Sequence, residues 1–147
     1  MLLRIFIAAA VLGLIAGAVI AQSDPIAARK ALMKSNNDNA RAMVQTMREQ
    51  KPFEAAAVEA AFAQWADTAQ KLPGLFPENS KTGGDTHATP KVWQNKKDFD
   101  EKAAAFGKAV AENRDKAKES LDGLKAAIPI VGKTCDNCHE DYRLSTQ

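Results

Sequence analysis

Two cysteines and a histidine stand within five residues near the end of this sequence. The segment Cys135-Asp136-Asn137-Cys138-His139 matches the C-x-x-C-H pattern that is typical of covalent c-type haem attachment. Each thiol of such a pair joins a haem vinyl group as a thioether, and the histidine is placed to bind the iron from one side. We therefore predict one covalently bound haem c, with Cys135 and Cys138 as thioether residues and His139 as the proximal axial ligand.

Other functions of a C-x-x-C pair agree less well with the rest of the chain. A thioredoxin-like redox pair expects a βαβ setting, and no stretch has the pattern of alternating strands and helices. A structural zinc site usually takes four protein ligands. The chain has two cysteines and two histidines, the second histidine being His87 in a polar stretch. A chance match to the pattern is the third alternative.

The N-terminus has the features of a secretory signal peptide. Arg4 supplies a positive charge, residues 5–20 are apolar, and a cleavage position precedes Gln22. The alternative is an uncleaved membrane anchor, but an apolar run of about 16 residues is shorter than the roughly 20 that a spanning helix needs. We expect a signal peptide over 1–21 and a haem-binding domain over 22–147. Because haem of this kind is attached outside the bacterial cytoplasm, we predict a periplasmic location without stable membrane insertion after cleavage.

Composition argues against several classes of function. The 20 Lys and Arg residues nearly balance 18 Asp and Glu residues, which gives no case for a nucleic-acid partner. Both cysteines belong to the motif, so no thiol is left for a disulfide framework. Carboxylates such as Glu54 and Glu59 fall on polar helix faces without an acid–base constellation. We therefore expect no enzyme activity.

Four segments show the apolar period of amphipathic helices, and runs of β-branched residues are absent. The first three begin at Asp24-Pro25, Lys51-Pro52 and Thr89-Pro90, because proline suits the first position of a helix. The fourth covers 121–142. The predicted core positions are Ile26, Met33, Ala40, Met43 and Met47 in the first segment, Val58, Phe62, Trp65, Ala69 and Leu72 in the second, Val92, Phe99, Ala103, Phe106 and Val110 in the third, and Leu121, Leu124, Ile128, Val131, Cys135, Cys138 and Tyr142 in the fourth.

Breaks between these segments suggest how they are connected. Residues 73–89 form a long polar loop rich in glycine and proline, whereas Pro129 and Gly132 predict a kink or a helix start inside the fourth segment. Trp65 and Trp93 are interpreted as helix-packing anchors. Four amphipathic segments without a strand pattern predict an all-α fold, an antiparallel up-down-up-down four-helix bundle holding one c-type haem. Another all-α arrangement of the same helices is the alternative.

The motif lies unusually close to the C-terminus for a small c-type cytochrome. The residues that follow His139 include no methionine or histidine, so any sixth iron ligand comes from upstream. The chain resembles the class II cytochromes c, the cytochrome c′ family. The resemblance rests on Arg29-Lys30-Ala31-Leu32-Met33-Lys34, Leu75-Phe76-Pro77, Pro90-Lys91-Val92-Trp93 and the stretch from Gly132 to Arg143.

That resemblance implies one haem lodged between four helices, with electron transfer or diatomic-gas binding in the periplasm. The family divides into five-coordinate members, which bind nitric oxide or carbon monoxide, and a low-spin cytochrome c-556 type with a methionine ligand from the first helix. Leu32-Met33-Lys34 and Lys51-Pro52-Phe53 are closer to the second type. The resemblance therefore implies Met33 as the distal axial ligand. It also allows a homodimer.

Helix geometry can be argued separately. In an antiparallel bundle Met33, near the start of the first helix, lies level with His139, near the end of the last. Met43 and Met47 lie roughly 15–21 Å further along at 1.5 Å per residue, so we interpret both as core fillers. A core role is also the alternative for Met33.

These observations predict a periplasmic monohaem cytochrome that carries one electron, with low-spin haem held by His139 and Met33. The alternative is a five-coordinate protein that binds nitric oxide or carbon monoxide. Arg143 lies four residues after His139 and so shares its helix face, where it screens the proximal side or meets a propionate. Its alternative is a solvated cation that favours the C-terminal helix dipole. The expected partners are periplasmic redox proteins.

Overall fold

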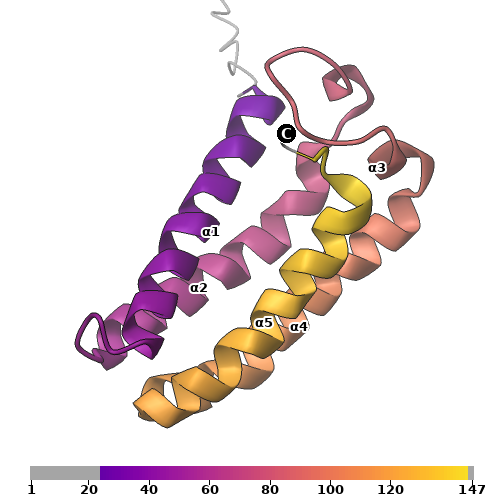
Figure 1. Cartoon of the computed structure of the whole chain (residues 1–147). Coiled ribbons are helices and arrows are strands. Elements are labelled where there is room, and N and C mark those ends of the chain that lie inside the picture. Colours follow the sequence, from indigo (N-terminus) through magenta and orange to yellow (C-terminus); the bar gives the residue numbers. More distant parts are fainter. Residues whose placement is uncertain (1–23, 146–147) are drawn as a thin grey trace, which may run out of the picture.

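Four long helices dominate the computed structural model, which describes residues 24–145. They run alternately down and up, so that the start of the first and the end of the last lie at the same end of the molecule (Figure 1). The long helices are α1 (Pro25–Met47), α2 (Ala55–Lys71), α4 (Lys96–Glu119) and α5 (Leu121–Tyr142), and the short ones are η1 (Leu72–Leu75), η2 (Glu78–Ser80) and α3 (Lys91–Gln94). The predicted all-α, antiparallel four-helix bundle is confirmed.

Helix α1 begins where the sequence predicts. The Asp24 carboxylate accepts a hydrogen bond from the backbone N–H of Ile26 at 2.9 Å, and Pro25 occupies the first turn. These two features satisfy or remove N–H groups that have no partner inside the helix. Ser120 caps α5 in the same way, because its hydroxyl accepts from the N–H of Gly123 at 3.1 Å.

Two predicted boundaries are wrong. Helix α2 begins at Ala55 rather than at Lys51-Pro52, and Glu54 is its extended N-cap residue. Phe53 packs against the core from the segment before the helix, which holds that segment outside the helix. The third predicted helix is divided at Asn95, whose φ of −125° and ψ of 47° separate α3 from α4.

The helix start predicted inside the fourth segment is also absent, since α5 continues from Leu121 to Tyr142 past Pro129 and Gly132. The physical reason is the position of Pro129 on the exposed side of the helix. A proline removes the hydrogen bond to the carbonyl four residues earlier, and on this side water can satisfy that carbonyl. The predicted helix start at this point is therefore wrong.

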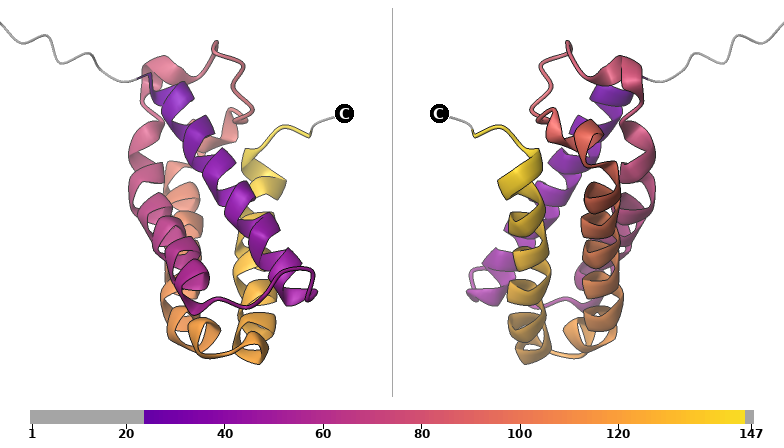
Figure 2. Two further views of the ribbon diagram at one scale, coloured as in Figure 1. Left: turned by 90° about the vertical axis from the view of Figure 1, so that its left-hand side faces the viewer. Right: turned by 90° about the vertical axis from the view of Figure 1, so that its right-hand side faces the viewer.

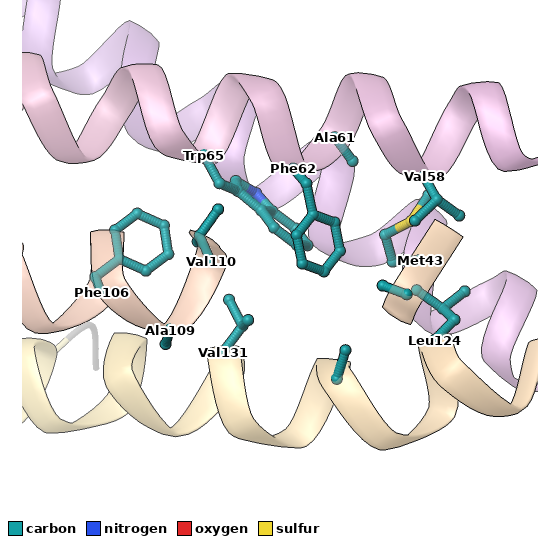
Figure 3. Close-up of a cluster of buried hydrophobic side chains, with 12 residues drawn as sticks. Met43, Val58, Ala61, Phe62, Trp65, Phe106, Ala109, Val110, Leu124 and Val131 are labelled. Carbon is teal, nitrogen blue, oxygen red and sulfur yellow. The ribbon is translucent and has the colours of Figure 1, made fainter. Parts of the chain in front are cut away.

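Buried side chains form two groups along the bundle. The larger group lies where α1, α2, α4 and α5 meet, and Figure 3 shows Met43, Phe62, Trp65 and Leu124 pointing into it. A smaller group joins Val92, Phe99 and Tyr142 nearer the end that carries the termini. Most predicted core positions are buried, whereas Met33 is only half-buried because it borders a cavity.

Candidate haem site

A cavity of about 330 Å³ opens between α1, α4 and α5 and the loop that precedes α3. Its volume lies in the range of small-molecule and cofactor sites, about 300–1,000 Å³. The residues that line it are Arg29, Lys30, Met33, Lys34, Leu72, Phe76, His87, Ala88, Phe99, Cys138, His139, Tyr142 and Arg143. The walls are largely apolar, and the cations lie on α1 and at the end of α5.

A smaller cavity of about 40 Å³ adjoins the first. Both cavities are lined by Met33, Leu72, Cys138 and His139, and the smaller one also reaches Cys135. The structure thus brings the predicted distal residue on α1 to the same space as the motif on α5. Met43 lies elsewhere, buried in the larger core group at 3 % exposure, which confirms its predicted core role.

The motif lies on the last turns of α5, with both thiols half-buried. Burial raises the pKa of Cys135, and the charge of Asp136 raises it further. Burial also raises the pKa of Cys138, to about 11. Catalytic redox thiols are characterised by a lowered pKa, so this environment does not suit a thioredoxin-like pair.

Burial lowers the pKa of His139, and the nearby charge of Arg143 lowers it further. The imidazole is therefore neutral at pH 7, and a neutral imidazole nitrogen is the form that binds a metal. Arg143 itself is exposed and lines the cavity from the end of α5. Its contact with a propionate stays a prediction.

Aromatic side chains form one wall of the cavity. Phe76 packs edge-on against both Trp93 and Phe99, with ring centroids 5.7 and 4.7 Å apart, and Phe99 packs against Tyr142 at 5.2 Å. Tyr142 is 5 % exposed and donates its hydroxyl hydrogen to Asp98. Trp65 packs 5.0 Å from Phe62 in the larger core group. The anchoring role predicted for Trp65 is confirmed, whereas Trp93 is half-buried and packs against the loop residue Phe76.

Four basic residues that line this cavity were not predicted to be functional from the sequence. Lys30 and Lys34 line the cavity from α1, and His87, interpreted only as a surface residue, is exposed but also lines it. Arg29 is 5 % exposed and spans the space between α1 and the loop before α3. The sequence did contain one indication for Arg29: it lies four residues before Met33 and therefore on the same helix face.

The residues present fit a haem c. Two thiols and an imidazole border a largely apolar cavity, and Arg143 lines it with a charge that suits a propionate. Lys30 and Lys34 also line the cavity, where they pair with Asp85 and Asp38. Among residues 24–145, no three His, Cys, Asp or Glu side chains gather closely enough to hold a metal ion. The zinc alternative therefore has no second set of ligands in this part of the chain.

A helical bundle whose last helix presents a C-x-x-C-H motif to an apolar cavity defines a bundle haem protein. The family model of cytochrome c′ matches residues 24–143. A cytochrome c-556 and a cytochrome c′ of Rhodopseudomonas palustris are 40% and 38% identical over 146 and 143 residues, and each match covers 97% of both chains. The chain belongs to the cytochrome c′ family.

Solved structures agree with this assignment. Cytochrome c′ from Rhodopseudomonas palustris has a TM-score of 0.81 at 37% identity, covering 86% of this chain and 100% of that one. The NMR-validated model of oxidised cytochrome c556 from R. palustris has a TM-score of 0.78 with the same identity and coverage. Members of the family bind one covalently attached c-type haem and are generally electron carriers or gas-binding proteins. The predicted cofactor is confirmed.

Proposed function

We propose that this protein is a periplasmic monohaem cytochrome that carries one electron. Cys135 and Cys138 hold the haem as thioethers, His139 is the proximal ligand and Met33 the distal ligand. The observation that supports this proposal is the shared lining of two adjoining cavities by Met33 and His139, which come from the antiparallel helices α1 and α5. Arg143 lines the larger cavity beside His139 and suits a propionate or the proximal face.

The chemistry of these side chains suits an electron carrier. A bound haem supplies a one-electron couple, and histidine–methionine ligation raises its potential. A methionine thioether on the distal side also blocks access of small ligands. The aromatic wall of Phe76, Phe99 and Tyr142 excludes water from the same space, which favours the less charged state of the cofactor.

Processing and location follow from the N-terminal segment, which lies outside the described residues. We propose that residues 1–21 are removed by a signal peptidase and that residues 22–147 act in the periplasm with other redox proteins. None of the described helices is long and apolar enough to cross a membrane. A homodimer is part of the proposal, since one cytochrome c′ that is 28% identical, with a TM-score of 0.74, is described by its ligand-controlled dimer dissociation.

The second candidate is a five-coordinate protein that binds nitric oxide or carbon monoxide. One observation favours it: the similarity to a protein named cytochrome c′ is nearly the same as the similarity to a cytochrome c-556, 38% against 40% identity. Neither candidate gives the protein an enzymatic reaction or a nucleic-acid partner.

Absorption spectra of the purified ferric and ferrous holoprotein separate the two candidates, because they report the spin state of the iron directly. A low-spin Soret pattern together with a weak sulfur-to-iron band in the far red supports methionine ligation and the electron carrier. A high-spin spectrum in both oxidation states contradicts it and leaves the gas-binding protein.

A further inference from the structure

The loop between α2 and α4 is bound to α1 by one buried arginine. Nη1 of Arg29 donates to the Leu75 carbonyl at 3.1 Å and to the Ser80 hydroxyl at 3.0 Å. Nη2 donates to the Ser80 carbonyl at 2.9 Å and to the Thr86 hydroxyl at 2.6 Å. The guanidinium also stacks on the Phe76 ring, with its central carbon 4.6 Å from the ring centroid. A single side chain thus binds three separated points of the loop.

Neighbouring contacts on α1 support this attachment. Nζ of Lys30 pairs with the Asp85 carboxylate at 2.9 Å, and Gly84 lies so close to Ile26 that a Cβ there would approach the isoleucine side chain to 3.0 Å. Gly83, Gly84 and Asp85 have φ values of 88°, 54° and 53°. Three successive left-handed residues turn the loop sharply toward α1, a conformation that glycine and aspartate tolerate better than most residues.

The same loop is bound to α5 on its other side. The Thr89 hydroxyl donates to the Asp141 carbonyl at 2.9 Å, and the Thr89 N–H donates to the Tyr142 carbonyl at 3.0 Å. In the opposite direction the N–H of Leu144 donates to the His87 carbonyl at 2.8 Å. The loop therefore connects the beginning of α1 to the end of α5, and Figure 2 shows it at the end of the bundle where α1 begins and α5 ends.

These attachments lie one turn from the two proposed iron ligands. Arg29 precedes Met33 by four residues on α1, and Asp141 and Tyr142 follow His139 by less than one turn on α5. Figure 2 shows α1 inclined across the bundle, whereas α4 and α5 run side by side. Besides the direct contacts of α1 with α2 and α5, the loop is thus one structure that can set how far the start of α1 lies from the end of α5.

We propose that Arg29 is a positioning residue that controls iron coordination. By holding the loop between α1 and α5, Arg29 keeps Met33 close enough to bind the iron. The distal position is then occupied by Met33 and is closed to other ligands. This inference rests on the proposed function in one respect, that Met33 is the distal ligand. Thr89 acts at the opposite attachment, so loosening either end should have the same effect on the iron.

The test uses four holoprotein variants. Arg29→Gln removes the forked donor, Arg29→Lys keeps the charge but not the fork, and Thr89→Val removes one hydroxyl at nearly constant shape. Arg114→Gln is the control, since Arg114 pairs with Glu59 on α2, away from the loop. Each protein is measured by amide hydrogen exchange over residues 75–89, by the far-red band of the ferric form, and by the rate of carbon monoxide binding to the ferrous form.

We expect Thr89→Val, which loses one neutral hydrogen bond, to raise loop exchange and the carbon monoxide binding rate roughly threefold. Arg29→Gln, which loses hydrogen bonds from a charged group, should raise both by about tenfold or more. Both should weaken the far-red band. For Arg29→Lys, loop exchange and the carbon monoxide binding rate should lie between those of Arg29→Gln and the wild type. Arg114→Gln should change neither of these two rates. If Arg29→Gln does not yield a holoprotein, Arg29→Lys and Thr89→Val are compared with the wild type by the same three measurements.

Two results would overturn the inference. Unchanged loop exchange in Arg29→Gln would show that the arginine does not hold the loop. Faster exchange with unchanged carbon monoxide binding would show that the loop has no influence on the iron. A wild type that is already high-spin refutes Met33 ligation instead. In that case the role proposed for Arg29 in iron coordination fails as well, whereas the loop-exchange measurement still shows separately whether Arg29 holds the loop.

Discussion

Met33 and His139 come from opposite ends of the described chain, yet their side chains line the same two cavities. The antiparallel arrangement of α1 and α5 produces this relationship, because the first turns of one helix then lie level with the last turns of the other. The proposed ligation would use the Met33 thioether and the His139 imidazole to hold a haem in this space.

Replacing Met33 by Ala should convert the iron from six- to five-coordinate. The thioether sulfur is removed, and the half-buried position leaves a space that a diatomic gas can enter. We expect loss of the far-red band, a high-spin Soret spectrum and rapid carbon monoxide binding, all measured by absorption spectroscopy. Met43→Ala is the matched control, since this methionine is buried in the core away from the cavity. Identical spectra for wild type and Met33→Ala would contradict the assignment.

Haem should stay attached to the chain after acid–acetone extraction, because thioether bonds at Cys135 and Cys138 resist this treatment. Intact-mass spectrometry should show one haem mass added to the polypeptide. Cys135→Ala with Cys138→Ala should yield a poorly folded chain, because the unfilled cavity loses the stabilisation that a bound ligand provides. A cooperative melt of this double variant near that of the holoprotein would argue against a structural role for the haem.

The same mass measurement tests export. If residues 1–21 form a cleaved signal peptide, the periplasmic fraction should contain a chain that begins at Gln22. Edman sequencing or peptide mapping of the purified protein checks the exact position. Recovery of the full-length chain from the membrane fraction would instead support an uncleaved anchor.

Phe62→Ala should strongly destabilise the bundle. Phe62 is 0 % exposed at the centre of the larger core group, and truncation of a buried aromatic residue typically costs about 3–5 kcal/mol. Denaturant unfolding of the holoprotein measures the loss. Ile130→Ala is the control, since Ile130 is 51% exposed and surface changes usually stay within about 0.5 kcal/mol. Equal losses in both variants would contradict the placement of the core.

The ion pair between Glu59 and Arg114 should contribute stability that depends on pH. The hydrogen bond from Arg114 lowers the pKa of Glu59, so the folded state binds the proton less readily than the unfolded state. The contribution is therefore present above the ordinary glutamate pKa of about 4.3 and is lost as the pH falls through the lowered value. Unfolding curves of Glu59→Gln should approach those of the wild type as the solution is acidified below this range.

Glu119→Gln, at the exposed end of α4, provides the comparison for this titration. A difference between wild type and Glu59→Gln that stays constant from neutral to strongly acidic pH would show that the pair has no electrostatic role.

Local patterns in the sequence were sufficient for the motif, the four-helix arrangement and most of the core. Covalent attachment depends on residues within one turn of a helix, and apolar periodicity depends on neighbours three and four positions apart, so both are visible without tertiary information. The cap at Asp24 and the core stripe through Val58, Phe62 and Trp65 are of this kind.

Other features depend on contacts between residues far apart in the sequence, and these contacts are visible only in the tertiary structure. Pro129 is compatible with a continuous helix because its side of α5 faces solvent, and Phe53 delays α2 because it packs on the core. Arg29 is buried because a loop some fifty residues later folds over it and supplies four acceptors. From the sequence of α1 alone, such an arginine is predicted to be an exposed cation on the helix surface. Its burial requires hydrogen-bond acceptors from the distant loop, and these lie close to it only in the folded chain.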